Sequence, residues 1–270
     1  MKLVKSHGLG NDYLVLASGE PLSPERVRAL CDRHCGVGSD GVLEPVPSER
    51  ADHGLRIWNP DGSLAEKSGN GLRIFSRWLV DHAGASPRHT IEVAAGVVQS
   101  EVHPDGAVTV EMGAATFAPA AIPCARPLID ASLSVAGVEL RVTAVGMGNP
   151  HCVVFAPEGA ELDALPWRDW GREIEVHPLF PNRTNVQVAA VRSRGVVEAR
   201  VWERGAGPTL ASGSSACAVA AAARRLGHVD AAVDVVMPGG TLQVWVETDN
   251  VRLRGPVEEI AVVNLSRPLP

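Results

Sequence analysis

Apolar positions follow two patterns along the chain, and together they predict both strands and helices. Short apolar runs bounded by glycine-containing turns predict strands, whereas longer runs that begin at a serine predict helices. Strands are expected within residues 2–5, 13–17, 90–110, 133–144 and 258–264, and turns that run into strands at 147–155 and 178–186. Helices are expected at residues 23–34, 69–82, 162–173 and 213–226. The chain should therefore combine a strand-rich framework with a few helices.

The pattern contains an internal repeat. Shifting the chain by 144 positions aligns Gly54–Asn59 with Glu198–Glu203, and Ser68-Gly69 with Ser212-Gly213. In each copy a strand-like run with arginine and tryptophan leads through a polar loop to a Ser-Gly pair, and then to an apolar run of helical length. Each Ser-Gly pair should begin a helix, where unpaired N–H groups and the positive end of the dipole attract anions. We therefore expect a ligand carboxylate or oxyanion held between two similar halves.

The repeat also predicts two domains. Residues 119–127 are rich in proline and alanine and are the best candidate for a linker. We expect an N-terminal domain of residues 1–119 plus 261–270 and a C-terminal domain of residues 120–260, with the strand near residues 258–264 returning to the first domain.

Composition narrows the class of partner. The chain has 270 residues, a formal net charge of −6 and no lysine or arginine cluster, which argues against nucleic acid and against an anionic membrane surface. A small molecule is the expected partner. The five cysteines are expected to be reduced thiols, and no apolar segment typical of an export signal follows Met1, so a cytoplasmic protein is expected.

Two serines are the candidate catalytic groups. A carboxylate bound by two opposed helix ends would place its α-carbon between Ser68 and Ser212, and two opposed acid–base groups are what stereoinversion at carbon requires. Glu203 and His151 are the titratable residues best placed to tune that pair. Arg204 could clamp a second carboxylate through two hydrogen bonds. Amides that could orient a zwitterionic ligand follow predicted strands at Asn11, Asn59, Asn149 and Asn185.

Each of these residues also has a structural interpretation. Serine is a favoured N-cap, turn asparagines tolerate left-handed backbone, and a histidine before a buried strand is often an interior residue. The glycines of Gly36–Gly41 suit either a tight turn or a close approach to a ligand. Cys31 and Cys35 beside His34 only hint at zinc, because no second ligand pair follows at a suitable spacing, and no metal is expected. Cys217 should be a small core residue.

Five motifs in order resemble the diaminopimelate epimerase family, whose members work without pyridoxal phosphate. They are His7–Asp12, Gly36–Gly41, Asn59–Ser63 with Ser68–Gly71, Gly148–His151 and Glu203–Gly207. The resemblance implies an α+β fold of two pseudo-symmetric domains, each a curved, mostly antiparallel sheet around a central helix, with a ligand cleft between them. It implies no cofactor and a possible homodimer. The ligand-binding positions that it implies are Asn11, Asn59, Gly69, Asn70, Asn149, Asn185, Glu203, Arg204, Gly213 and Ser214, and His151 and Glu203 match the pair thought to tune the catalytic groups.

The sequence departs from the family at the catalytic pair. The two thiols of the family fall at Ser68 and Ser212, and an alcohol needs a neighbouring base before it can accept a carbon-bound proton. Cys217 lies about one and a half helical turns beyond Ser212 and cannot substitute for it. A glutamine that contacts substrate in some members falls at Gly41, and a family Gly-Glu-Thr reads Gly207-Pro208-Thr209.

The first hypothesis is an epimerase that inverts the α-carbon of LL-2,6-diaminopimelate to the meso form, in the pathway to lysine and peptidoglycan precursors. The second is an amino-acid-binding protein that kept the cleft and lost the bases. The third is an enzyme of the same fold with a different amino-acid substrate or reaction. A further reading is that the serines replace native cysteines, which the native gene sequence would decide.

Overall fold

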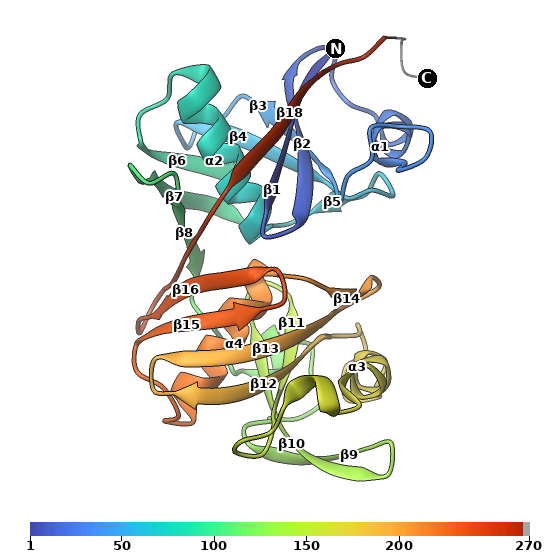
Figure 1. Cartoon of the computed structure of the whole chain (residues 1–270), viewed down its shortest axis with the longest axis vertical. Coiled ribbons are helices and arrows are strands. Elements are labelled where there is room, and N and C mark those ends of the chain that lie inside the picture. Colours follow the sequence, from blue (N-terminus) through green and yellow to red (C-terminus); the bar gives the residue numbers. More distant parts are fainter. Residues whose placement is uncertain (267–270) are drawn as a thin grey trace. The chain divides into compact units, whose positions relative to one another are not determined.

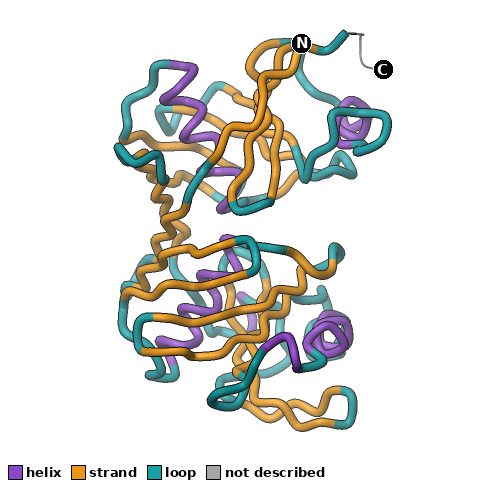
Figure 2. The backbone as a smooth tube through the Cα atoms, viewed as in Figure 1, coloured by secondary structure: helices purple, strands orange, loops and turns teal. Residues whose placement is uncertain are grey.

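A computed structural model describes residues 1–266, and these residues form the strand-dominated α+β fold that the sequence predicts. Figure 2 shows how strands outnumber helices throughout. The α-helices are α1 (Pro24–Cys31), α2 (Gly69–Ala83), α3 (Trp167–Glu175) and α4 (Gly213–Arg225), and short 3₁₀ helices are η1 (Pro119–Ala121) and η2 (Leu162–Ala164). No helix within the described residues is long and apolar enough to cross a membrane.

The chain divides into two compact units, Met1–Glu111 with the segment from Arg254 onward, and Met112–Leu253. The chain leaves the first unit in β8 (Val108–Gly113) and returns in β17 (Val251–Gly255). The sequence placed these crossings later, near residues 119 and 261. Residues 267–270 of the predicted first domain lie outside the described residues. Ile122 and Cys124, from the proline- and alanine-rich segment, are buried in the core of the second unit, so the chain enters that core before residue 127.

The first unit is built from strands that surround α2 (Figure 1). They are β1 (Lys2–Gly8), β2 (Asn11–Ser18), β3 (Val42–Val46), β4 (His53–Trp58), β5 (Leu64–Ala65), β6 (Arg88–Val93), β7 (Gly96–Val102) and β18 (Glu258–Asn264). The strand β18 returns to the first unit, as the sequence predicted, and there it pairs antiparallel with β1. The strand β1 therefore lies between the hairpin partner β2 and β18, a segment more than two hundred residues away in sequence.

The second unit surrounds α4 in the same way. Its strands are β9 (Ala131–Val135), β10 (Val138–Gly146), β11 (Pro150–Phe155), β12 (Asn185–Ser193), β13 (Val196–Glu203), β14 (Gly207–Thr209), β15 (Ala232–Met237) and β16 (Gly240–Val246). The helix α4 is lined by alanine and is buried along most of its length, because small side chains allow strands to approach it closely.

The two units share one order of strand pairings, which confirms the internal repeat. A hairpin (β1/β2 or β10/β11) is followed by a parallel pair (β2–β3 or β11–β12) and by an antiparallel pair (β3–β4 or β12–β13). The strand that carries the repeated tryptophan (β4 or β13) then pairs parallel with the strand that follows the central helix (β6 or β15). In each unit a short strand and the Ser-Gly pair precede that helix.

Three of the four helix starts follow the sequence closely, and the start of α3 does not. Ser23 caps α1 by accepting a hydrogen bond from the N–H of Arg26, with Pro24 in the first turn. The helix then ends at Cys31, three residues before the predicted His34. The predicted helix at residues 162–173 is instead a 3₁₀ turn followed by α3, because Pro166 interrupts it and Leu165 before it is extended.

Candidate functional site

Ser68 caps α2, and its hydroxyl is held from two sides. Its Oγ accepts a hydrogen bond from the backbone N–H of Gly71 at 3.0 Å, and the phenol oxygen of Tyr13 lies 3.2 Å from it. The N-cap interpretation of Ser68 is therefore confirmed. The first turn of α2 carries no acidic side chain, so the N–H groups and the positive dipole end at Gly69 and Asn70 favour an anion there.

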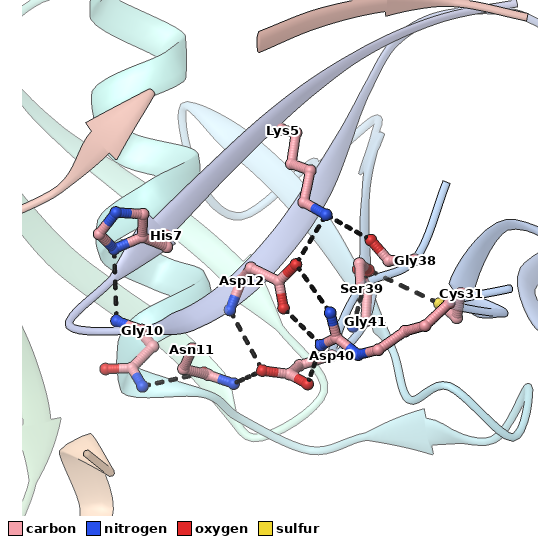
Figure 3. A network of polar contacts seen from close by, with 12 residues as sticks. Lys5, His7, Gly10, Asn11, Asp12, Cys31, Gly38, Ser39, Asp40 and Gly41 are labelled. Carbon is pink, nitrogen blue, oxygen red and sulfur yellow. Dashed lines mark hydrogen bonds and ion pairs between the residues drawn. The ribbon is translucent and has the colours of Figure 1, made fainter. Parts of the chain in front are cut away.

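A chain of amide hydrogen bonds starts in the same turn. Arg73, with no exposed surface, donates to Oδ1 of Asn70 at 2.8 Å, and Nδ2 of Asn70 donates to Oδ1 of Asn11 at 2.9 Å. Nδ2 of Asn11 then donates to Oδ2 of Asp40 at 2.8 Å, as Figure 3 shows. The guanidinium of Arg73 lies at one end of this chain of hydrogen bonds and the carboxylate of Asp40 at the other. If either amide turned over, a donor would face a donor or an acceptor would face an acceptor. Each amide has a second N–H that this chain of hydrogen bonds does not use and whose direction it fixes.

Charged residues around the β1–β2 hairpin hold Asp40 in place. Arg33 bridges the carboxylates of Asp40 and Asp12 at 2.6 and 2.7 Å, and Lys5 pairs with Asp12 at 3.0 Å (Figure 3). Burial by itself would raise the pKa of Asp12, but the hydrogen bonds and charges of Arg33 and Lys5 outweigh it, so that the pKa lies below its usual range. Asp12 therefore stays ionised at neutral pH.

Ser212 occupies the corresponding position at α4 but is bonded differently. Its backbone is extended like that of Ser68, yet its side chain makes no capping hydrogen bond. Ser212 and Gly213 are buried, and Ser214 is partly exposed. The first turn of α4 also lacks acidic side chains, which leaves its N–H groups suited to an anion. The two serines are thus equivalent in place but not in bonding.

His151 is fully buried and neutral. Its Nδ1 lies 3.0 Å from Nε2 of Gln187, and because an amide nitrogen only donates, Nδ1 is the acceptor. The proton is therefore on Nε2, which donates to Oδ1 of Asn149 at 2.8 Å. Burial, followed by the positive charge of Arg204, lowers the pKa of His151 to about 3. His151 is thus an interior histidine, and its side chain also orients the amide of Asn149.

Gln187 links this histidine to the central helix. Its Nε2 also donates to Oγ of Ser215 in α4 at 3.0 Å, whereas its buried Oε1 has no partner among the described residues. The strands β11 and β12 run parallel with His151 opposite Asn185, two residues before Gln187. This register connects the β10–β11 turn to α4.

Asn185 lies where β12 begins, and Glu203 and Arg204 lie where the antiparallel neighbour β13 ends. Asn185 donates to the carbonyl of Pro150 at 2.9 Å and accepts from the backbone N–H of Arg204 at 2.9 Å. The guanidinium of Arg204 is exposed and bonds the carbonyl of Asn182 at 3.3 Å. Glu203 is half-buried where β13 ends beside β14. The buried asparagine therefore fixes the backbone that presents Arg204.

Hydrogen bonds link some of the predicted residues to one another. Asn11 is bonded to Asn70 and Asn149 to His151, whereas the side chain of Asn59 bonds Ser63 within its own turn at 3.0 Å. Sequence reasoning missed the residues that orient the others, namely Tyr13, Asp40, Arg73, Gln187 and Ser215. Polar residues within apolar runs were the available signal: Gln187 lies between two valines and Arg73 between a leucine and an isoleucine.

The buried histidine predicts a pH-dependent stability. Between the ordinary His pKa of 6.5 and the folded value of about 3, the unfolded chain binds a proton that folded His151 does not. The free energy of unfolding should therefore fall as pH falls through this range, with a contribution from this group of about 1.4 kcal/mol per pH unit. Urea unfolding of the wild type and of His151→Asn at several pH values measures this. The difference between the two proteins should change with pH below 6.5, and a constant difference would contradict the assignment.

Comparison with known proteins gives the same family throughout the chain. The family described as "Diaminopimelate epimerase" matches residues 3–118 and 143–259. A protein named diaminopimelate epimerase 2 from Nostoc sp. is 43% identical, covering 98% of this chain and 96% of that protein. One named diaminopimelate epimerase from Magnetococcus marinus is 44% identical, covering 96% of this chain and 95% of that protein.

Solved structures share the fold at lower identity. A probable proline racemase from Agrobacterium radiobacter has a TM-score of 0.73 at 16% identity, with 98% of this chain and 92% of that one covered. A predicted epimerase from Pseudomonas aeruginosa has a TM-score of 0.70 at 18% identity, with 99% of each chain covered. At such identities the likeness concerns the fold alone, and it agrees with the two-domain α+β architecture.

Proposed function

The chain belongs to the diaminopimelate epimerase family, and from that membership we propose that it inverts the α-carbon of LL-2,6-diaminopimelate to the meso form. The observation that carries the proposal is 43% identity over 98% of the chain with a relative of that name. The reaction proceeds by two-base proton transfer without pyridoxal phosphate. It belongs to the synthesis of lysine and peptidoglycan precursors in the cytoplasm.

Ser68 and Ser212 are the two acid–base groups in this proposal. Both stand at the N-termini of central helices whose first turns lack acidic side chains, which supports binding of the substrate carboxylate by the backbone N–H groups of Gly69, Asn70, Gly213 and Ser214. The serines stand where the family has thiols, so they set the rate of the reaction rather than its stereochemistry.

The distal amino-acid group of the substrate needs both a positive and a negative partner. The exposed guanidinium of Arg204 suits the second carboxylate, and Glu203 suits the second ammonium group. Asn59, Asn149 and Asn185 supply amides, and each of them has at least one polar atom already held by a hydrogen bond inside the protein. Asn11 acts beside Asn70 through the N–H that their chain of hydrogen bonds does not use.

Exchange of the α-proton tests the proposal directly. In heavy water the protein should exchange the α-hydrogen of LL- or meso-diaminopimelate for deuterium, which proton NMR detects even when turnover is slow. Exchange should require the protein at high concentration, because two alcohols replace two thiols. The Ser68→Cys, Ser212→Cys variant is measured beside it. Absence of exchange in both proteins would refute the proposed function.

The serines favour one alternative, a diaminopimelate-binding protein without catalysis. A site that keeps its helix ends, Arg204 and its amides retains the groups that hold a ligand while lacking thiols. Calorimetry that shows tight binding, together with silent exchange by the wild type, would establish this alternative.

We propose in addition that the protein is a homodimer that uses β18. This strand pairs with β1, and it exposes Ile260 and Val262, with 52% and 46% of their surfaces accessible. An exposed apolar strand edge is a site where another chain can pair. Sedimentation should give a dimer for the wild type and a monomer for Ile260→Lys, Val262→Lys. Equal masses for the two proteins would contradict this interface.

A further inference from the structure

The hydroxyl of Ser68 has a titratable partner that the sequence did not assign. Tyr13 is the only tyrosine of the chain, it is 7% exposed, and its phenol oxygen lies 3.2 Å from Oγ of Ser68. Its ring packs on Gly41 so closely that a Cβ added there would lie 2.6 Å from the ring. The position of the phenol is therefore fixed by packing, and any larger residue at position 41 would displace it.

Aligning the glycines that turn the two hairpins gives Tyr13 a counterpart. With Gly10 set on Gly148, a shift of 138 positions instead of the 144 of the central helices, Leu9-Gly10-Asn11-Asp12-Tyr13 aligns with Met147-Gly148-Asn149-Pro150-His151, and the second turn is one residue longer than the first. The glycines that turn the two hairpins have nearly the same left-handed backbone, with φ of 90° and 85°. Each returning strand packs on its central helix and pairs in parallel with the next strand. Tyr13 thus stands in the first unit where His151 stands in the second.

The contact of Tyr13 is the more direct of the two. Tyr13 bonds the serine itself, whereas His151 bonds Asn149 and Gln187. His151 is also neutral and poorly basic because of its burial. The first unit therefore pairs its serine with a phenol, whereas the side chain of Ser212 in the second unit makes no capping hydrogen bond.

A phenol remedies the chemical weakness of serine. An ordinary tyrosine has a pKa of about 10, only about 1.5 units above that of a free thiol, whereas an alcohol is a much weaker acid. The N–H of Gly71 and the helix N-terminus both stabilise negative charge on Oγ of Ser68. The phenol can therefore take or return the serine proton while the helix end lowers the cost of the charge that develops between them.

We propose that Tyr13 and Ser68 form a proton relay for the acid–base step at this face of the substrate, an inference that rests on the proposed epimerase function. In one direction Oγ of Ser68 takes the proton from the Cα–H bond while its own proton passes to the Tyr13 phenolate. The electron pair of that bond stays on the substrate carbon as a carbanion. In the other direction Ser68 gives its proton to the carbanion and takes the proton of the Tyr13 hydroxyl.

Charged residues lie on the elements that pack against Tyr13. On the elements that pack against it they are Lys5 and His7 on β1, Asp12 on β2, Asp40 before β3, Glu44 on β3, and Lys67 and Arg73 around the start of α2. Lys5, Asp12 and Asp40 share one ion-pair network with Arg33, and Glu44 is bonded to Arg56 and Trp58. Removing the phenol oxygen alone, as in Tyr13→Phe, leaves these pairs intact and keeps the ring on Gly41.

A first test needs no catalysis. Because the chain has a single tyrosine, its phenolate absorbance in an ultraviolet pH titration reports Tyr13 alone. Ser68→Ala removes a hydrogen-bond partner of the phenolate and should raise the apparent pKa of Tyr13 by about 0.5–1 unit, whereas Ser212→Ala should leave it unchanged. Circular dichroism at each pH confirms that the chain stays folded. Identical titration curves for wild type and Ser68→Ala would overturn the coupling.

A second test uses α-proton exchange. In the wild type the exchange rate should rise with pH towards 10, and Tyr13→Phe should remove this rise and lower the rate about 10²-fold or more. In the Ser68→Cys background the same change should alter the rate less than about threefold, because a thiol ionises without the phenol. Equal losses in both backgrounds would show that Tyr13 acts only on the structure and would overturn the relay.

The outcomes also separate the relay from the function on which it rests. If the Ser68→Cys, Ser212→Cys variant exchanges the α-proton and the wild type does not at any pH, the Tyr13–Ser68 proton relay is overturned. The proposal that this fold binds diaminopimelate and exchanges its α-proton would stand. Absence of exchange in both would refute the function itself, and the titration would then report only a structural contact. Wild-type exchange that depends on Tyr13 only while residue 68 is serine supports the relay.

Discussion

Replacing both Ser68 and Ser212 with cysteine should raise the rate of α-proton exchange on diaminopimelate by about 10²–10⁴-fold, the usual range for a well-matched acid–base group. The two helix N-termini account for the size of this effect. They lower the pKa of a thiol placed at their ends and so supply a thiolate near neutral pH. An alcohol at the same position remains protonated. At Ser68 a hydrogen-bonded partner such as Tyr13 is needed to take the hydroxyl proton.

The two single variants refine this prediction. Because Ser68 has a phenol beside it and Ser212 makes no side-chain cap bond, cysteine should gain more at position 212. Ser76→Cys, in the same helix as Ser68 but buried against Ser100, is the matched control and should leave the rate unchanged. NMR exchange rates at equal protein concentration decide the matter. A double variant as slow as the wild type would contradict the assignment of these positions as the acid–base pair.

Replacing Asn70 with leucine should lower the free energy of unfolding by about 2–4 kcal/mol. Asn70 is 4% exposed and joins Arg73 to Asn11. Leucine of similar size leaves a buried guanidinium N–H and a partly buried amide oxygen without these partners, and each such loss costs about 1–3 kcal/mol. Urea unfolding at neutral pH measures the change. A loss below about 0.5 kcal/mol would show that the hydrogen bonds of Asn70 to Arg73 and Asn11 contribute little to stability.

Asn70→Asp is the informative control for the same position. Aspartate still accepts from Arg73, so stability should lie closer to the wild type than that of the leucine variant. It cannot donate to Asn11, whose amide must then turn over and oppose its oxygen to Asp40. The aspartate variant should therefore bind diaminopimelate more weakly than its stability suggests, which calorimetry measures. An affinity for diaminopimelate equal to that of the wild type would contradict the proposal that the hydrogen bonds of Asn70 orient the amide of Asn11.

Local signals explain what could be predicted of the fold. Ser68 caps α2 through its neighbour Gly71, and the internal repeat placed Ser212-Gly213 at the start of α4, so both helix starts were predicted correctly. The hairpin at Asn11 and the return of β18 to β1 were also predicted. The prediction of where α3 starts was wrong, although Pro166 lies directly before the true start. The reason is that the apolar spacing continues through the 3₁₀ turn that precedes the helix.

The orienting residues of the site depend on contacts that no local pattern reports. Gln187 meets His151 through the parallel register of β11 and β12, across more than thirty residues of chain. Asn11 meets Asp40 and Asn70 from three separate elements. A sequence indicates that a buried polar residue needs a partner, but the identity of that partner follows only from strand register and loop geometry.

The pairing of β18 with β1 also sets an order of events during synthesis. Residues 112–253 form one contiguous unit and can close as soon as they leave the ribosome. The unit that begins with β1 cannot be completed until residues 258–264 have been made, so its hairpin edge stays open while the rest of the polypeptide is translated. The half that is translated first is therefore the half that finishes folding last.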